Sequence, residues 1–232
     1  MDIQNYFSKL NTESQSVFNE SLTKKEKLGN LHHLSSCIYE LASFVRDPQE
    51  KIILETVSAQ LESSNYNLII GLYRQAFSSL RLALEMGLAA IYFSASKLEM
   101  HEWLDGRMDI KWSRLIDEEN GVLSKRFTKA FFSEVIDDVE NYRKNAICVY
   151  RKLSEYVHGN NETWVNGSIK ITYNDNTFEK YCRYYKTVTE TILFSALCRY
   201  SKLLDESERE SLQFVTEEFN HILKIRELFG RA

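Results

Sequence analysis

The longest apolar pattern in the chain lies at residues 66–97. Its apolar side chains recur at spacings of three and four residues, a period that places them along one face of an α-helix. They are Ile69, Leu72, Tyr73, Ala76, Phe77, Leu80, Leu84, Leu88 and Ile91. We therefore expect a long, central, buried helix, with Arg81 and Glu85 forming an i,i+4 ion pair at the edge of the core.

A second long helix is predicted over residues 134–158, and Gly159 marks its end because glycine commonly stops helices. Its broad apolar face consists of Val139, Tyr142, Ala146, Val149, Tyr150, Leu153, Tyr156 and Val157. Arg151, Ser154 and His158 lie on the other side. Seven residues turn a helix through about 700°, so Arg151 and His158 point within about 20° of each other.

Further helices are predicted in most of the remaining chain. Thr23-Lys24-Lys25-Glu26 has the form of a capping box, and Asp47-Pro48 combines a capping aspartate with a proline suited to the first helical position. The predicted spans are 1–22 (a short helix or a loose arm), 23–46, 47–63, 123–132, 178–204 and 207–229. Ser63-Ser64-Asn65 is expected to cap the central helix.

Two segments lack a helical pattern. Residues 99–121 are broken into short pieces, and we expect Trp103 and Trp112 to cover the core there. Residues 159–167 are rich in asparagine and glycine and predict a loop. The run SIKITY at 168–173 alternates as a strand does, and it would need a partner in a small β-hairpin near 164–175.

These patterns together predict an all-α fold, a single-domain helical bundle with long antiparallel helices. Residues 1–65 would form an N-terminal helical extension packed on the main helical bundle at 66–232, and the two would make up one continuous domain. The 232 residues include one proline and eight glycines, so few positions interrupt the helices. The hydrophobic share of 44% and the charged share of 27% are ordinary for a globular protein.

Charge, cysteine spacing and missing motifs narrow the function classes. The net charge of −4 gives no overall basic field for nucleic acid, so such binding would need a local basic patch. The four cysteines are scattered without a CxxC pair, and neither HExxH nor a glycine-rich phosphate loop occurs. We therefore expect no metal site and no cofactor.

The sequence also lacks the usual marks of a secreted or membrane protein. Its first residues show no basic region followed by an apolar core. The longest apolar run, residues 82–93, contains Glu85 and is too short to span a bilayer. We expect a cytoplasmic protein with no membrane partner.

Two stretches together resemble the HEPN superfamily of helical domains, of the type associated with abortive infection and other defence genes. One is YRQAFSSLRLALEMGL at 73–88, which carries Arg81 and Glu85 as arginine-x3-glutamate. The other is YRKLSEYVHGN at 150–160, in which six residues separate Arg151 from His158. The resemblance covers about residues 66–204.

This resemblance implies a metal-independent ribonuclease that works as a homodimer, with the Arg–His helices of two subunits meeting at one cleft. His158 would be the general acid or base acting on RNA, and Arg151 would hold the scissile phosphate. Lys144, Lys152 and Ser154 would contact the substrate beside them. Active members often carry asparagine or aspartate directly after the arginine, where this chain has Lys152.

Two functions stay open at this point. The first is an endoribonuclease that acts on RNA in antiphage defence or as the toxin of a toxin–antitoxin pair. The second is a non-catalytic HEPN-like scaffold or adaptor that binds a partner protein in a defence or regulatory complex. In the second case Arg151 would bridge to Glu155, and His158 would only bond the last carbonyls of its helix.

Overall fold

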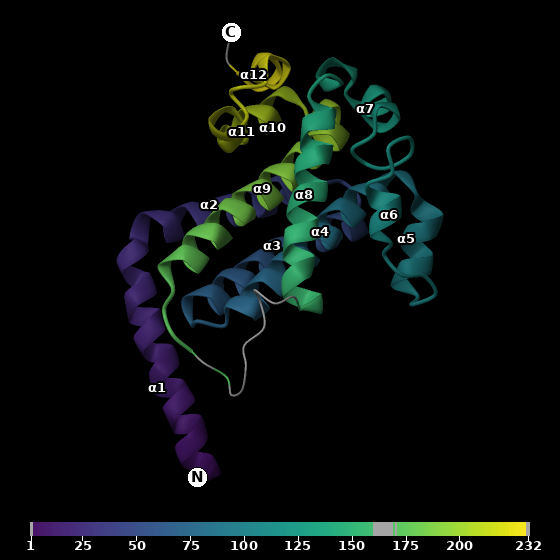
Figure 1. Cartoon of the computed structure of the whole chain (residues 1–232). Coiled ribbons are helices and arrows are strands. Elements are labelled where there is room, and N and C mark those ends of the chain that lie inside the picture. The colour runs from purple at the N-terminus through teal and green to yellow at the C-terminus, as the bar shows by residue number, and fades with distance from the viewer. Residues whose placement is uncertain (1, 160–168, 170, 231–232) are drawn as a thin grey trace.

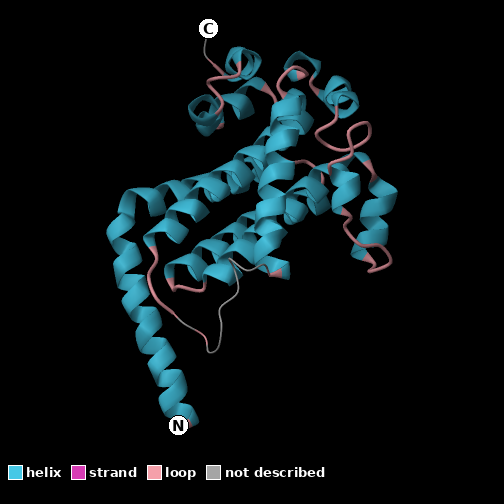
Figure 2. Cartoon of the chain, in the orientation of Figure 1, coloured by secondary structure: helices cyan, strands magenta, loops and turns pink. Residues whose placement is uncertain are grey.

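The computed structural model describes residues 2–159, 169 and 171–230, and this part of the chain is a helical bundle (Figures 1 and 2). The long helices are α1 (Ile3–Ser21), α2 (Lys25–Ser43), α3 (Pro48–Ile69), α4 (Tyr73–Ala95), α8 (Val139–His158) and α9 (Asp175–Tyr200). The shorter ones are α5 (Lys97–Leu104), α6 (Trp112–Leu115), α7 (Lys125–Phe131), α10 (Glu206–Ser211), α11 (Gln213–Glu218) and α12 (Leu223–Phe229). The predicted all-α fold is confirmed.

Helix α4 is the centre of the bundle and packs against α3, α8 and α9. It runs parallel to α9, since Phe77 lies beside Tyr181 and Ser94 accepts a hydrogen bond from Arg199. Its inward face is fully buried, as the apolar period predicts. By length and composition alone α4 could cross a membrane, but here it is the core helix of the bundle.

Helix α3 is longer than predicted, because it continues through Ser63 to Ile69. The predicted caps are buried instead: the Ser64 hydroxyl donates to the carbonyl of Ala76 at 2.7 Å, and the Asn65 amide donates to the Tyr185 hydroxyl at 3.1 Å. The chain turns only at Gly71, whose φ of +82° suits glycine. The predicted boundary at residue 65 therefore falls inside a helix.

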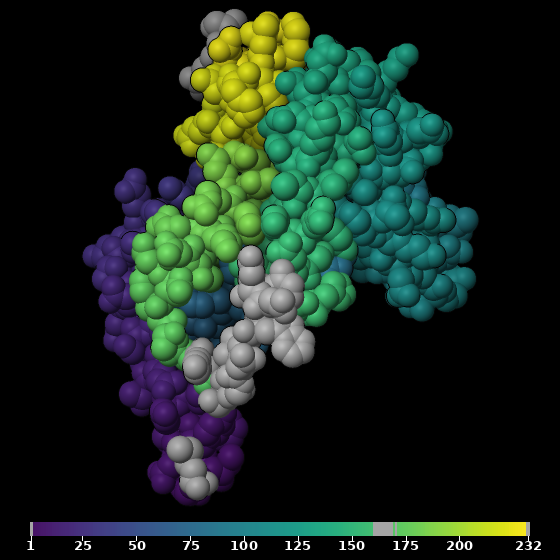
Figure 3. Space-filling view, viewed as in Figure 1, coloured from purple at the N-terminus to yellow at the C-terminus, as the bar shows by residue number. Residues whose placement is uncertain are grey.

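The N-terminal segment forms the continuous helix α1, which extends beyond the bundle as a rod (Figures 1 and 3). Val17 and Ser21 are its buried residues. The capping box predicted after it does not form, since the Thr23 hydroxyl donates to the carbonyl of Glu20 at 2.7 Å. The Asp47 cap is confirmed, because its carboxylate accepts from the backbone N–H groups at the start of α3.

The C-terminal segment predicted as one helix folds into three, α10 to α12. The apolar residues Leu212, Val215, Phe219 and Ile222 follow a helical period, and all four are buried in the main hydrophobic core. Breaking the helix lets side chains from successive turns converge on that core. A single straight helix would extend away from it.

The small hairpin predicted near 164–175 lies mostly outside the described residues. Within the described part, residues 171–174 form no strand and lead directly into α9. The two tryptophans in the broken segment cover the core as expected. Trp103 stacks on Phe93 with ring centroids 5.3 Å apart, and Trp112 stacks on Tyr150.

The turn at Gly71 gives a test of this packing, with Gly106 as its control. A Cβ at residue 71 would lie 2.9 Å from a methyl of Ile171, whereas a Cβ at residue 106 would meet open space. Both glycines have positive φ, so each alanine substitution costs about 1–2 kcal/mol in backbone strain. We expect overpacking to lower the free energy of unfolding of Gly71→Ala by about 1–3 kcal/mol more. Urea unfolding measures this free energy for both variants. Equal losses in Gly71→Ala and Gly106→Ala would contradict the close packing at residue 71.

Candidate functional site

The predicted Arg151–His158 pair lies on the outer side of α8. Both side chains are exposed, while Val139, Tyr142, Ala146, Val149 and Leu153 are buried on the opposite side. The apolar face is thus as predicted, apart from Val157, which is 37% exposed. The helix ends at Gly159, whose φ of +79° ends the helical path.

Helix α4 holds the last turn of α8 through residues on one of its faces. The Arg74 guanidinium donates to the carbonyl oxygens of Tyr156 and Val157, at 2.8 Å and 3.1 Å. Phe77 stacks on the Tyr156 ring with centroids 3.9 Å apart. A cation on the last carbonyls of a helix satisfies open acceptors and favours the helix dipole. These carbonyls are therefore bonded by Arg74 and not by His158.

Arg81, two turns after Arg74 on α4, contacts the imidazole of His158. Its Nη1 lies 3.3 Å from Nε2 of His158, a contact between residues 77 positions apart. A guanidinium only donates hydrogen bonds and stays charged. In this contact Nε2 is therefore the acceptor, an arrangement that requires the tautomer with its proton on Nδ1.

The other side of Arg81 is fixed by a triangle of polar groups. Its Nη2 donates to the Tyr150 hydroxyl at 2.6 Å and lies 3.4 Å from Oε1 of Glu85, and the Tyr150 hydroxyl donates to the same Oε1 at 2.9 Å. Burial first, then the hydrogen bond to Glu85, raises the pKa of Tyr150, so the hydroxyl keeps its proton. The predicted Arg81–Glu85 ion pair is confirmed, and it belongs to a larger cluster.

Aromatic rings enclose this cluster. The Arg81 guanidinium carbon lies 4.6 Å from the centroid of the Tyr150 ring, a cation–π distance. Trp112 stacks on the same ring with centroids 3.7 Å apart and planes 3° apart. The Arg81 side chain is 16% exposed, and its Nε–H is buried with no hydrogen-bond partner among the described residues. An unmet buried donor costs about 1–3 kcal/mol, so this arginine is held at an energetic cost.

The remaining predicted site residues lie along the exposed side of α8. Lys144 pairs with Glu140 at 3.6 Å, and Lys152 pairs with Glu155 at 3.5 Å. Ser154 donates its hydroxyl to the carbonyl of Tyr150 at 2.7 Å. Among the described residues Arg151 makes no hydrogen bond or ion pair, so the predicted bridge from Arg151 to Glu155 is wrong and Lys152 makes it instead.

The sequence reasoning missed the roles of Arg74 and Tyr150 and the approach of Arg81 to His158. One signal was available: Arg74 and Arg81 are seven residues apart, and so share one face of a helix that is otherwise largely apolar. Tyr150 was assigned to the apolar face, where it does lie half-buried, but its hydroxyl joins the polar cluster.

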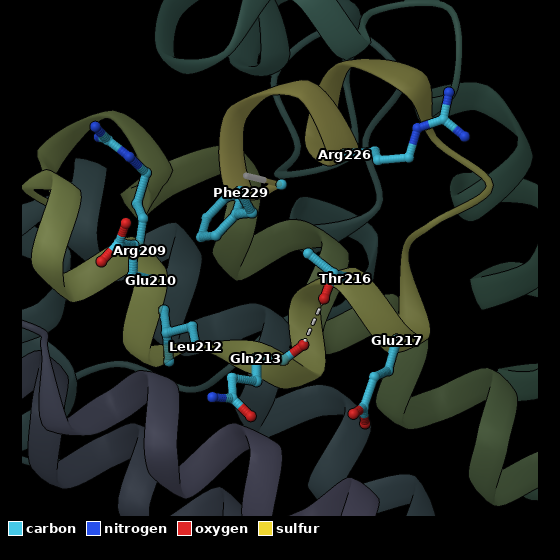
Figure 4. Close-up of a pocket in the computed structure, with 9 residues that line it drawn as sticks. Arg209, Glu210, Leu212, Gln213, Thr216, Glu217, Arg226 and Phe229 are labelled. Atoms are coloured by element: carbon cyan, nitrogen blue, oxygen red, sulfur yellow. Dashed lines mark hydrogen bonds between the residues drawn. The ribbon is translucent and has the colours of Figure 1, made fainter. Parts of the chain in front are cut away.

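No metal site is formed by the described residues, since they include no group of three or more metal-binding side chains. Burial raises the pKa of the Cys37 thiol to about 12 and that of Cys182 to about 11, so both remain protonated. A groove of about 470 Å³ lies between α10, α11 and α12 (Figure 4). Arginines and glutamates line it together, and it is at the opposite end of α8 from His158 (Figure 1).

Comparisons with known proteins add no relative. No protein-family model matches the chain, and no curated protein or solved structure matches it. The site is therefore argued from its own geometry.

The hydroxyl of Tyr150 can be tested against that of Tyr142, another α8 tyrosine. Both rings stack on an aromatic neighbour, but among the described residues the Tyr142 hydroxyl has one hydrogen-bond partner, His221, at 3.2 Å. Tyr150→Phe removes the hydroxyl that accepts from Arg81 and donates to Glu85, so we expect it to lower the free energy of unfolding by about 1.5–3 kcal/mol. Tyr142→Phe should cost about 0.5–1.5 kcal/mol. If Tyr150→Phe lowers the free energy of unfolding no more than Tyr142→Phe does, the Tyr150 hydroxyl does not link Arg81 and Glu85 as described.

Proposed function

We propose that this protein is a cytoplasmic, HEPN-like, metal-independent endoribonuclease that acts in antiphage defence or as a toxin. The observation that carries the proposal is the exposed His158 imidazole, on the same face of α8 as Arg151, which has no ion pair within the described part of the chain. A neutral imidazole can take a proton near pH 7, and a guanidinium binds phosphate oxygens. A base and a phosphate-binding cation are two of the groups that RNA cleavage without a metal uses.

The proposed reaction is attack of a ribose 2′-oxygen on the adjacent phosphorus. Nε2 of His158 accepts the 2′-hydroxyl proton as the new P–O bond forms, while Arg151 stabilises the charge on the phosphoryl oxygens. The bond from phosphorus to the 5′-oxygen then breaks, and that oxygen leaves with a proton from the second subunit's His158, which enters the step as an imidazolium. The products are a 2′,3′-cyclic phosphate and a 5′-hydroxyl. Lys144, Lys152 and Ser154 flank this stripe and provide local positive charge and a hydroxyl.

A homodimer fits this chemistry, because the reaction needs one base and one acid. In the proposed dimer the exposed sides of two α8 helices meet, and each brings an imidazole to a shared cleft. Ile147, 39% exposed in the same stripe, supplies apolar contact. Arg151 and Lys152 from both subunits would repel each other, and an RNA phosphate between them relieves that repulsion.

A non-catalytic scaffold that binds a partner protein is the second candidate. The observation that favours it is the Arg81 contact, which occupies the Nε2 lone pair that a base must use. Lys152, at the position where active HEPN proteins often have asparagine or aspartate, favours it as well. In this case the Arg151–His158 face is dispensable or is covered by the partner.

Cleavage of total cellular RNA by the purified full chain tests the first function. EDTA is present throughout, and His158→Ala is compared with His101→Ala, which alters an exposed histidine on α5. We expect wild type and His101→Ala to cut and leave 2′,3′-cyclic phosphate ends. We expect His158→Ala to be slower by about 100-fold or more, as for loss of a general base.

The opposite results are equally informative. Equal cleavage by His158→Ala would place any activity elsewhere. Absence of cleavage by wild type, together with elution as a monomer, would support the scaffold.

A further inference from the structure

Arg81 of α4 presents a charged donor at the proposed site that the Arg–His pair on α8 does not account for. Its Nη1 bears two N–H groups and contacts Nε2 of His158. Its Nη2 is tied to Tyr150 and Glu85, so the guanidinium is fixed while one of its ends faces the exposed imidazole. This contact prevents His158 from acting as a base, because Nε2 cannot accept a 2′-hydroxyl proton while Arg81 donates to it.

A phosphate oxygen is a better acceptor for this donor than a neutral imidazole. Both hydrogen bonds have the charged guanidinium as donor, but only the phosphate oxygen also carries charge, so the Coulomb attraction is stronger there. Arg81 is also largely shielded from water, which strengthens that attraction. Glu85 neutralises Arg81 only in part, since the Glu85 carboxylate is shared with the Tyr150 hydroxyl. Arg151, exposed two turns before His158, adds a second cation on the approach side.

We propose that Arg81 is a phosphate-binding residue whose transfer from His158 to the RNA phosphate switches the site on. In the free protein Nη1 holds the imidazole as the Nδ1–H tautomer with Nε2 blocked. The scissile phosphate of RNA takes the Nη1 donor, and Nε2 is released beside the 2′-hydroxyl whose proton it accepts. Arg81 thus ties activation of the base to the presence of substrate.

This inference rests on the proposed function, and it assigns the positioning of His158 to α4. Tyr150 and Glu85 keep Arg81 in place during the exchange, so the phosphate gains a fixed donor with no side chain to reorganise. The exchange explains how one geometry both blocks Nε2 and supports catalysis. The Arg81–His158 contact, taken alone, favours the non-catalytic scaffold. With the exchange, the same contact is the resting state of an enzyme.

The test is the tautomer of His158, read from long-range ¹H–¹⁵N correlations of the imidazole and assigned by comparison with His158→Ala. Wild type is expected to show the Nδ1–H tautomer. Adding a 2′-O-methyl RNA oligonucleotide, which binds as RNA but lacks the nucleophile, should remove that preference, and inorganic phosphate should do so at higher concentration. Arg81→Met/Glu85→Gln, which removes both charges together, should show no preference without ligand. Arg107→Met, an exposed arginine paired with Asp105, should behave as wild type.

Cleavage kinetics separate this inference from the proposed function. Arg81→Met/Glu85→Gln should lower kcat/KM about 100-fold, the usual loss for one preorganised donor, with Arg81→Lys recovering part of it. His158-dependent cleavage with a tautomer that RNA leaves unchanged would overturn the exchange and leave the ribonuclease standing. A tautomer that RNA changes, with no cleavage by wild type, would overturn the ribonuclease and leave Arg81 as a phosphate-binding residue. The same tautomer in wild type and in the double variant overturns the inference whatever the activity.

Discussion

The contact between the first half of α4 and the last turns of α8 is the constraint on which the site depends. The two helices run antiparallel, so Arg74 meets the carbonyls of Tyr156 and Val157, while Arg81 meets Tyr150 and His158. Phe77 stacks on Tyr156 between these two polar contacts. Without these contacts the end of α8 would be an exposed helix terminus before a glycine, and its last turn would fray.

Placing a charged pair on the central helix costs solvation energy that a purely apolar face would not lose. The fold offsets this cost with the Arg81–Glu85 pair, the Tyr150 hydroxyl and the Tyr150 ring. The offset is incomplete, since the Arg81 Nε–H is buried and finds no acceptor in the part of the chain that the structure describes. An unmet polar group beside a packed core needs an explanation other than packing. The cluster therefore supports a functional reading of this end of the bundle.

Periodicity alone predicted the fold class, the central helix and the buried face of α8, because an apolar face must pack wherever it occurs. It failed where polar residues are buried. Ser64 and Asn65 looked like caps, but their partners are tyrosines of α9, more than 100 residues further along the chain. It also failed at α10 to α12, where a helical period persists across bends that tertiary packing imposes.

The candidate site also has one part that the sequence predicted and another that it did not. The i,i+7 geometry of Arg151 and His158 is a local property, and their shared exposed face followed from the wheel. The contact of Arg81 with His158 is set by how α4 and α8 cross, which no local pattern encodes. Arg81 and Glu85 were predicted as a pair at the core edge, whereas their link to the end of α8 needed the structure.

Amide hydrogen exchange of α8 in the Arg74→Met variant tests most directly whether α4 holds the end of α8. Arg114→Met, which changes an exposed arginine on α6, is the control. Loss of the two carbonyl contacts removes about 0.3–1 kcal/mol from the last turn. The account predicts exchange about two- to fivefold faster in residues 155–158 and unchanged in residues 143–149, with no change in the control. Unchanged exchange at 155–158 would show that α4 does not hold the end of α8, and the account of the site would fail with it.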